Sequence, residues 1–266
     1  MKLTVPLLKG TLVQRRQRFL VDVKLEDESI VTAHTPNTGA MPQCAVAGYP
    51  VLLSRSDNPW RQYQFTLEKI QVGDHWVDIN PLRANRIVEE ALRLNRIGEL
   101  AGLQARPEFS YGESRIDFLL EGERKKILME VKSVTLLDEQ GAACFPDAVT
   151  LRGQKHLREL RKALQSGYRC VAFFLVQRDE ACAFRPADHI DPEYGRLLRE
   201  AVAAGVEILS YKTNTTEEET VLAESLPVIL DQPQPEAAET SPAPPDAVQE
   251  SLPNPEDSSS PNGVKQ

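Results

Sequence analysis

Asp117, Glu130 and Lys132 are the residues of this chain whose types and spacing could support catalysis. The two acids fall on strand-like segments, residues 115–120 and 127–133, in which apolar and polar residues alternate. Two carboxylates held side by side repel each other unless a cation lies near both. A divalent metal ion would supply that cation, and a neighbouring ammonium group could hold a water molecule or a phosphate oxygen. The expected chemistry is metal-dependent cleavage of a phosphodiester.

A short polar loop at residues 122–125 can join the two segments as a hairpin, with Glu121 opposite Lys126. This register puts the two acids directly across from each other, with β carbons about 5 Å apart. The other side of the hairpin is then apolar and contains two facing pairs: Phe118 with Met129, and Ile116 with Val131. The alternative for the polar side is an exposed ladder of salt bridges that includes Arg115.

The Glu-Val-Lys sequence at 130–132, with an Asp on the preceding strand, is the core of the PD-(D/E)xK nuclease pattern. Ile116 stands where that pattern often has Pro, and this departure does not affect the metal ligands. Asp117 and Glu130 are predicted to bind Mg²⁺ or Mn²⁺ through hard oxygen atoms. Lys132 is predicted to orient the attacking water or to stabilise the charge that develops on the phosphate.

A third carboxylate could complete the metal site. Glu89 and Glu90 lie on the helix expected before the hairpin, and Glu108 lies just ahead of the hairpin. For each of the three, a solvated position without a metal is the alternative, because such residues are often exposed. Glu90 is the predicted ligand among them. Asp147 lies in a turn before the next helix, where it could reach the metal or cap the helix; capping is the prediction.

Two groups of basic residues could bind nucleic acid. One lies on the helix expected at 153–164, where a solvated surface helix is the alternative and where Glu159 is the only acid. His156 is expected on the surface of this helix. The other group lies in the first twenty residues, near a turn-rich segment at 34–39 that could touch nucleic acid or be a structural turn. The predicted DNA contacts are Arg15, Arg16, Arg18, Arg152, Lys155 and Arg158.

The elements that must position these residues change in character near residue 80. Residues 1–80 contain six short strand-like segments separated by turn-forming residues: 10–13, 18–23, 30–33, 51–54, 62–70 and 76–79. Such a set is typical of a small barrel or sandwich, and an OB-like β-barrel is the predicted fold.

From residue 81 onward, helices alternate with strands, which is typical of an α/β domain. Helices are expected at 84–96, after the start signal Asn80-Pro81, and at 153–164 and 193–204. The apolar run at 169–176 predicts a central strand covered on both faces, followed by a strand at 206–211. We therefore predict a mixed α/β protein with three parts: an OB-like barrel (1–80), a PD-(D/E)xK nuclease-like α/β domain (81–230) and a tail (231–266).

The tail is rich in proline and acid. From Asp231 onward it holds eight of the nineteen prolines and seven acidic residues but only one basic residue, Lys265. It cannot bury enough apolar surface to become ordered, so we predict that it is disordered. Without it the net charge changes from −8 to −2, and a nearly neutral body with basic patches can still bind phosphates locally.

The four cysteines lack the close spacing that is typical of a zinc site or a redox pair, so reduced thiols are expected. No apolar run suits a signal peptide or reaches the ~20 residues of a membrane helix. These features predict a soluble, cytoplasmic protein with no membrane partner. The oligomeric state is open, and a dimer is compatible with the sequence.

Seven motifs in order resemble the sugar fermentation stimulation protein A (SfsA) family, and the likeness covers residues 8–230. They lie at 15–19, 36–39, 84–86, 114–118, 130–135, 145–149 and 152–157. The resemblance implies an OB-like domain joined to a nuclease-like α/β domain, non-specific DNA binding, and a regulatory role in sugar (maltose) utilisation in bacteria. It implies no settled enzymatic activity. The chain departs from the family in its acidic tail and at Ala40, where members often have a larger or basic residue.

Overall fold

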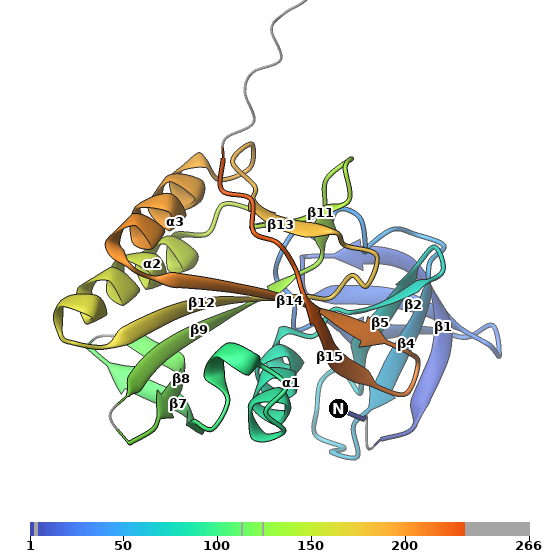
Figure 1. The fold of residues 1–266 in the computed structure, drawn as a ribbon. Helices are drawn as coiled ribbons and strands as arrows, with labels where there is room; N and C mark the ends of the chain where they lie inside the picture. Colours follow the sequence, from blue (N-terminus) through green and yellow to red (C-terminus); the bar gives the residue numbers. More distant parts are fainter. Residues whose placement is uncertain (3–4, 113, 124, 232–266) are drawn as a thin grey trace, which may run out of the picture. The chain divides into compact units, whose positions relative to one another are not determined.

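The computed structural model of this protein describes residues 1–2, 5–112, 114–123 and 125–231. Met1–Asp231 form one compact unit. Within the described part, this unit contains two six-stranded sheets and one three-stranded sheet (Figure 1). The disorder predicted for the tail concerns residues 232–266, which lie outside the described residues.

The predicted OB-like barrel is confirmed. Its strands are β1 (Leu7–Arg16), β2 (Leu20–Leu25), β3 (Ile30–His34), β4 (Pro50–Arg55), β5 (Phe65–Val72) and β6 (His75–Asp78). They are ordered β3-β2-β1-β4-β5-β6, and parallel pairing of β3 with β5 closes the barrel at Ala33 and Phe65. A bulge between Leu12 and Gln14 bends β1, so that its first half pairs with β4 and its second half mainly with β2.

The second large sheet carries the predicted hairpin. Its order is β15-β14-β12-β9-β8-β7, and β12 runs parallel to both β9 and β14. Its strands are β7 (Gln104–Tyr111), β8 (Ser114–Glu121), β9 (Lys126–Val134), β12 (Arg169–Val176), β14 (Glu207–Thr215) and β15 (Thr220–Ser225). The small sheet consists of β10 (Leu136–Leu137), β11 (Ala142–Phe145) and β13 (Ala183–Pro186). The central position predicted for 169–176 is thus confirmed.

Helices cover both faces of this sheet. Helix α1 (Pro81–Arg93) packs through Ile87 and Val88 on the face that contains Phe118 and Met129. Helices α2 (Leu151–Gln165) and α3 (Pro192–Ala204) pack on the opposite face, where they lie side by side (Figure 1). A short 3₁₀ helix, η1 (Gly98–Leu100), follows α1.

Each of the three α-helices begins at a residue whose side chain accepts a backbone hydrogen bond. Asn80 caps α1 ahead of Pro81, as the start signal predicts. Asp191 caps α3. Helix α2 is capped by Thr150, whose hydroxyl accepts a hydrogen bond from the amide of Gly153. The capping role predicted for Asp147 is therefore wrong.

The register of the β8–β9 hairpin is confirmed near its loop and differs farther away. Glu121 pairs with Lys126 and Phe118 with Met129, as predicted. The ladder ends there, because the carboxylate of Asp117 accepts the hydrogen bond of the Val131 amide. Ile116 packs with the core beneath α2 and α3 instead of facing Val131. The predicted Ile116–Val131 pair and the predicted direct pairing of Asp117 with Glu130 are therefore wrong. Asp117 instead contacts β9 through its side chain.

The remaining features agree with the composition. All four cysteines are free thiols, and only Cys182 is exposed. Across the part of the chain that is described, every helix is too short or too polar to span a membrane.

Candidate active site

Asp117, Glu130 and Lys132 line one pocket, a cavity of about 600 Å³. Its floor and walls come from segments that are distant in sequence: the barrel loop at 36–39, the start of α1, strands β7 to β9, and the loop between β11 and α2. The structure thus brings together the three residues predicted for catalysis, while their catalytic roles stay predictions.

Asp117 is held by two hydrogen bonds. Asn85, on α1, donates its side-chain amide to Oδ1 at 2.8 Å, and the backbone amide of Val131 donates to Oδ2 at 2.8 Å. Burial, together with the negative charge of Glu130, raises the pKa of Asp117 above its usual value. The two carboxylates thus share one pocket and interact electrostatically, but they are not the directly opposed pair that the sequence predicts.

Glu130 is buried, with 4% of its surface exposed, and its two oxygen atoms have different surroundings. Oε1 lies 2.7 Å from Lys132 Nζ and also contacts Nδ1 of His156. Burial by itself favours the neutral form, but the charge of Lys132 and the hydrogen bond with His156 outweigh it, so the pKa of Glu130 is lowered. Oε2 is buried and accepts no hydrogen bond from any described residue.

This donor set fits a hard divalent cation. An ionised carboxylate oxygen that is buried without a donor carries a large energetic cost, which a metal ion would remove. Glu130 Oε2 is such an atom, and Asp117 adds a second carboxylate whose ionisation is disfavoured without a cation. Asp117 and Glu130 could hold Mg²⁺, Mn²⁺ or Ca²⁺ through their oxygen atoms.

The third carboxylate differs from the prediction. Glu90 does not line the pocket, because it forms an ion pair with the terminal ammonium of Met1 at 2.8 Å. Glu108, one of the alternatives, does line the pocket. It belongs to β7, where its backbone φ is 55°. It pairs with Arg115 at 2.9 Å, and both side chains are largely exposed. Glu108 thus replaces Glu90 as the candidate third ligand.

His156 and Asp147 also belong to this site. His156 is 5% exposed and contacts Glu130, so its predicted place on the helix surface is wrong. Its spacing from Gly153 and Leu160 is helical, and both of these are buried, which is the signal that could have revealed it. Asp147 lines the pocket and accepts a hydrogen bond from the backbone amide of Met41 at 2.9 Å.

The six predicted DNA contacts separate into two classes. Arg18 and Arg152 are exposed and line the pocket. The other four are engaged with protein groups: Arg15 with backbone carbonyls, Arg16 with Asp22, Lys155 with Glu159 and Arg158 with Glu193. The last of these contacts shows that helix α3 brings acids against the basic helix, which the local sequence of α2 does not reveal.

Arg15 has a structural role in the site. Its guanidinium donates hydrogen bonds to the carbonyls of Asn37, Gly39 and Ala40 at 2.8–2.9 Å, and also to that of Arg18. These bonds hold the barrel loop at 36–39 in the pocket wall. The segment at 34–39 was predicted either to touch nucleic acid or to be a structural turn, and its residues 36–39 line the pocket.

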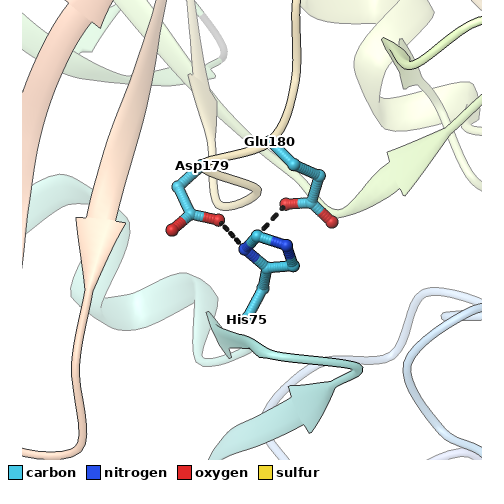
Figure 2. Close-up of side chains that lie close together, drawn as sticks. All are labelled: His75, Asp179 and Glu180. Atoms are coloured by element: carbon cyan, nitrogen blue, oxygen red, sulfur yellow. Dashed lines mark ion pairs between the residues drawn. The ribbon is translucent and has the colours of Figure 1, made fainter.

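A second group of metal-binding residue types lies outside this pocket (Figure 2). His75 Nδ1 lies 2.6 Å from Asp179 and 4.0 Å from Glu180. Glu180 also pairs with Arg178 at 2.5 Å. Arg178 and the imidazole of His75 contact these two carboxylates, so we interpret this group as a polar cluster between the β5–β6 hairpin and the loop after β12.

The chain matches two family models, one in the barrel and one in the α/β part that follows it. The family model described as "SfsA N-terminal OB domain" matches residues 13–79, and "Sugar fermentation stimulation protein RE domain" matches residues 82–219. A sugar fermentation stimulation protein homolog of Syntrophotalea carbinolica is 58% identical over 231 residues, covering 87% of this chain and 100% of that protein. One from Geobacter sulfurreducens is 52% identical over 226 residues, covering 84% and 97%. The structure of Pyrococcus furiosus SfsA in complex with Ca²⁺ aligns with a TM-score of 0.79 and 27% identity, covering 86% of this chain and 98% of that chain.

Proposed function

This chain belongs to the sugar fermentation stimulation protein family, and we propose that it is a metal-dependent nuclease that acts on DNA without regard to sequence. One observation carries the proposal. Glu130 Oε2 is buried without a hydrogen-bond donor among the described residues, beside Asp117 and in a pocket that Lys132 also lines. This is the charge arrangement that a divalent ion and a phosphate would complete.

Mg²⁺ or Mn²⁺ is the proposed cofactor. The P. furiosus structure contains Ca²⁺, which prefers the same oxygen ligands, and this supports a hard cation here. When bound, such an ion supplies an activated water and stabilises negative charge on the phosphate. Asp117 and Glu130 would hold it, with Glu108 as the candidate third carboxylate.

The other residues of the pocket position the reacting groups. Asn85 and the backbone of Val131 fix the orientation of the Asp117 carboxylate. Lys132 has its ammonium 3.2 Å from His156 Nδ1 and next to Glu130, where it can orient a water or stabilise an oxyanion. Arg18 and Arg152 would bind backbone phosphates, which are alike in every sequence.

DNA binding without cleavage is the second candidate function. It would suit the regulatory role in sugar utilisation that the family resemblance implies. The supporting observation is that Lys132 and His156 both contact Oε1 of Glu130, so the charge of this carboxylate is largely compensated without a metal ion. Turnover distinguishes the two candidates.

The test is a cleavage assay with the purified chain on single-stranded, duplex and branched DNA in Mg²⁺ or Mn²⁺. We expect cleavage that EDTA abolishes and that falls by about 10²-fold or more in Asp117→Asn and Glu130→Gln. Glu90→Gln, which changes a carboxylate outside the pocket, is the matched control and should retain activity. Cleavage that persists in Glu130→Gln would indicate a contaminant. No cleavage of any substrate would leave DNA binding as the function.

A further inference from the structure

The carboxylates of the pocket are recessed. Glu130 is 4% exposed, and the cavity of about 600 Å³ falls in the size range that encloses a small molecule or a nucleotide. The barrel loop at 36–39 and the loop before α2 are in contact at one wall of the cavity. Gly39 lies so close to the Asp147 carboxylate that a Cβ atom on it would be 2.6 Å away, and the backbone amide of Met41 donates a hydrogen bond to the same carboxylate. A stiff duplex is much wider than such a recess, whereas one flexible strand can enter it.

Apolar side chains stand exposed in the wall of this polar pocket. Leu82, at the start of α1, is 71% exposed, and Val149, before α2, is 66% exposed; both line the cavity. Leu151, two residues beyond Val149, is 75% exposed. Apolar side chains of this kind can pack against the faces of unstacked bases, which have no access to such contacts while they are paired and stacked in a duplex.

Positive charge lies beside these apolar side chains. Arg18 enters the pocket wall from the barrel and Arg152 from the first turn of α2, and both are exposed. Among the described residues, neither forms an ion pair with a carboxylate, unlike Lys155 and Arg158 farther along α2. A pocket that offers both apolar and cationic side chains suits a single strand, which presents both bases and phosphates.

We infer that the pocket takes an unpaired segment of DNA in preference to intact duplex. Bases of that segment pack against Leu82 and Val149, its phosphates pair with Arg18 and Arg152, and one phosphodiester reaches the recessed acids. The inference rests on the proposed function, since it names the form of DNA that the same site receives. Enzymes whose reactive groups are recessed commonly require a single strand or an extruded nucleotide.

The test is fluorescence anisotropy on the full chain in Ca²⁺, with a labelled single strand of about 12 nucleotides and a blunt duplex of the same sequence. We expect the single strand to bind at least about 10-fold more tightly than the duplex. The double variant Leu82→Ser/Val149→Ser should lower single-strand affinity by about 10-fold, since one stacked base commonly contributes that much. Ile30→Ser, at a residue that is 65% exposed outside the pocket, is the matched control and should bind as the wild type does.

Equal affinity for duplex and single strand, or a double variant that binds the single strand as tightly as the wild type, overturns the inference. Circular dichroism confirms that both variants fold. The two proposals also fail separately. Preferential single-strand binding without cleavage in Mg²⁺ would refute the nuclease and support the preference, whereas equal cleavage of both forms would do the reverse.

Discussion

Divalent cations should raise the melting temperature of this protein, and Asp117→Asn should remove most of that effect. Without a cation, burial and the charge of Glu130 disfavour the ionised form of Asp117, while Glu130 Oε2 has no donor among the described residues. A bound cation relieves both costs in the folded state alone. At a concentration 100 times its Kd, it stabilises the fold by about 2.7 kcal/mol. For a folded unit of this size, that corresponds to a shift of about 5–10 °C.

The variant should respond differently with and without metal. Asparagine keeps the shape of Asp117, and Asn85 can turn its amide to preserve a hydrogen bond. If the Kd rises about 100-fold, the same metal concentration contributes only about 0.4 kcal/mol, or roughly 1 °C. In EDTA the variant should be at least as stable as the wild type, because the ionised side chain that it lacks has a raised pKa in the folded state.

Differential scanning fluorimetry with Ca²⁺ or Mg²⁺ against EDTA measures both effects. Asp179→Asn is the matched control, because it removes a carboxylate from the polar cluster of His75 and leaves the pocket unchanged. A metal-induced shift that survives Asp117→Asn and disappears in Asp179→Asn would refute this reasoning and assign the metal to the cluster in Figure 2.

Three further predictions concern residues around the site. Arg15→Lys should lower the free energy of unfolding, measured in urea, by about 2–4 kcal/mol, because an ammonium group cannot replace the guanidinium that donates to several loop carbonyls. A loss of less than about 0.5 kcal/mol would contradict this role. Lys69 is buried and its pKa is lowered from 10.5 to about 8, mainly by burial. The unfolded chain therefore binds more protons between these values, so wild-type stability should rise with pH there relative to Lys69→Met, and parallel curves would disprove it. Arg18→Ala and Arg152→Ala should each reduce the slope of log K against log salt for DNA binding by about 1, whereas Lys155→Ala, whose cation already pairs with Glu159, should change it little; the opposite ranking would place the DNA outside the pocket, farther along α2.

Local patterns were sufficient for the strands of the barrel, the three α-helices and part of the hairpin, but they did not predict β7, β10, β11, β13 or β15. The strands of the barrel follow from alternation between turn-forming residues, and α1 follows from Asn80-Pro81. The pairing of Glu121 with Lys126 was predictable because the length of a hairpin loop sets the register of its strands. The end of the ladder at Phe118 was not, because a side chain, that of Asp117, takes over the hydrogen bond of Val131.

Contacts between distant segments could not be read from local patterns. Glu90 forms an ion pair with the ammonium of Met1, and Arg158 forms one with Glu193 on α3. Both partners are far away in the sequence, so neither pair follows from helical spacing. Glu108 lines the pocket from a point in β7 where its positive φ interrupts the regular strand. Glu90, on α1, does not line the pocket. For the same reason, single-strand preference could not be predicted from residue types, since it depends on how deeply packing recesses Glu130.

The sequence by itself determined the barrel strands, the three α-helices and the central strands of the second sheet, and which residues carry the charges that a nuclease needs, because periodicity and side-chain chemistry are local properties. Only the tertiary structure decided which of those charges meet and in what environment. Pairing, burial and the resulting pKa of a carboxylate depend on elements that arrive from far along the chain, and the same residue can be a solvated ion, a salt-bridge partner or a metal ligand according to what packs around it.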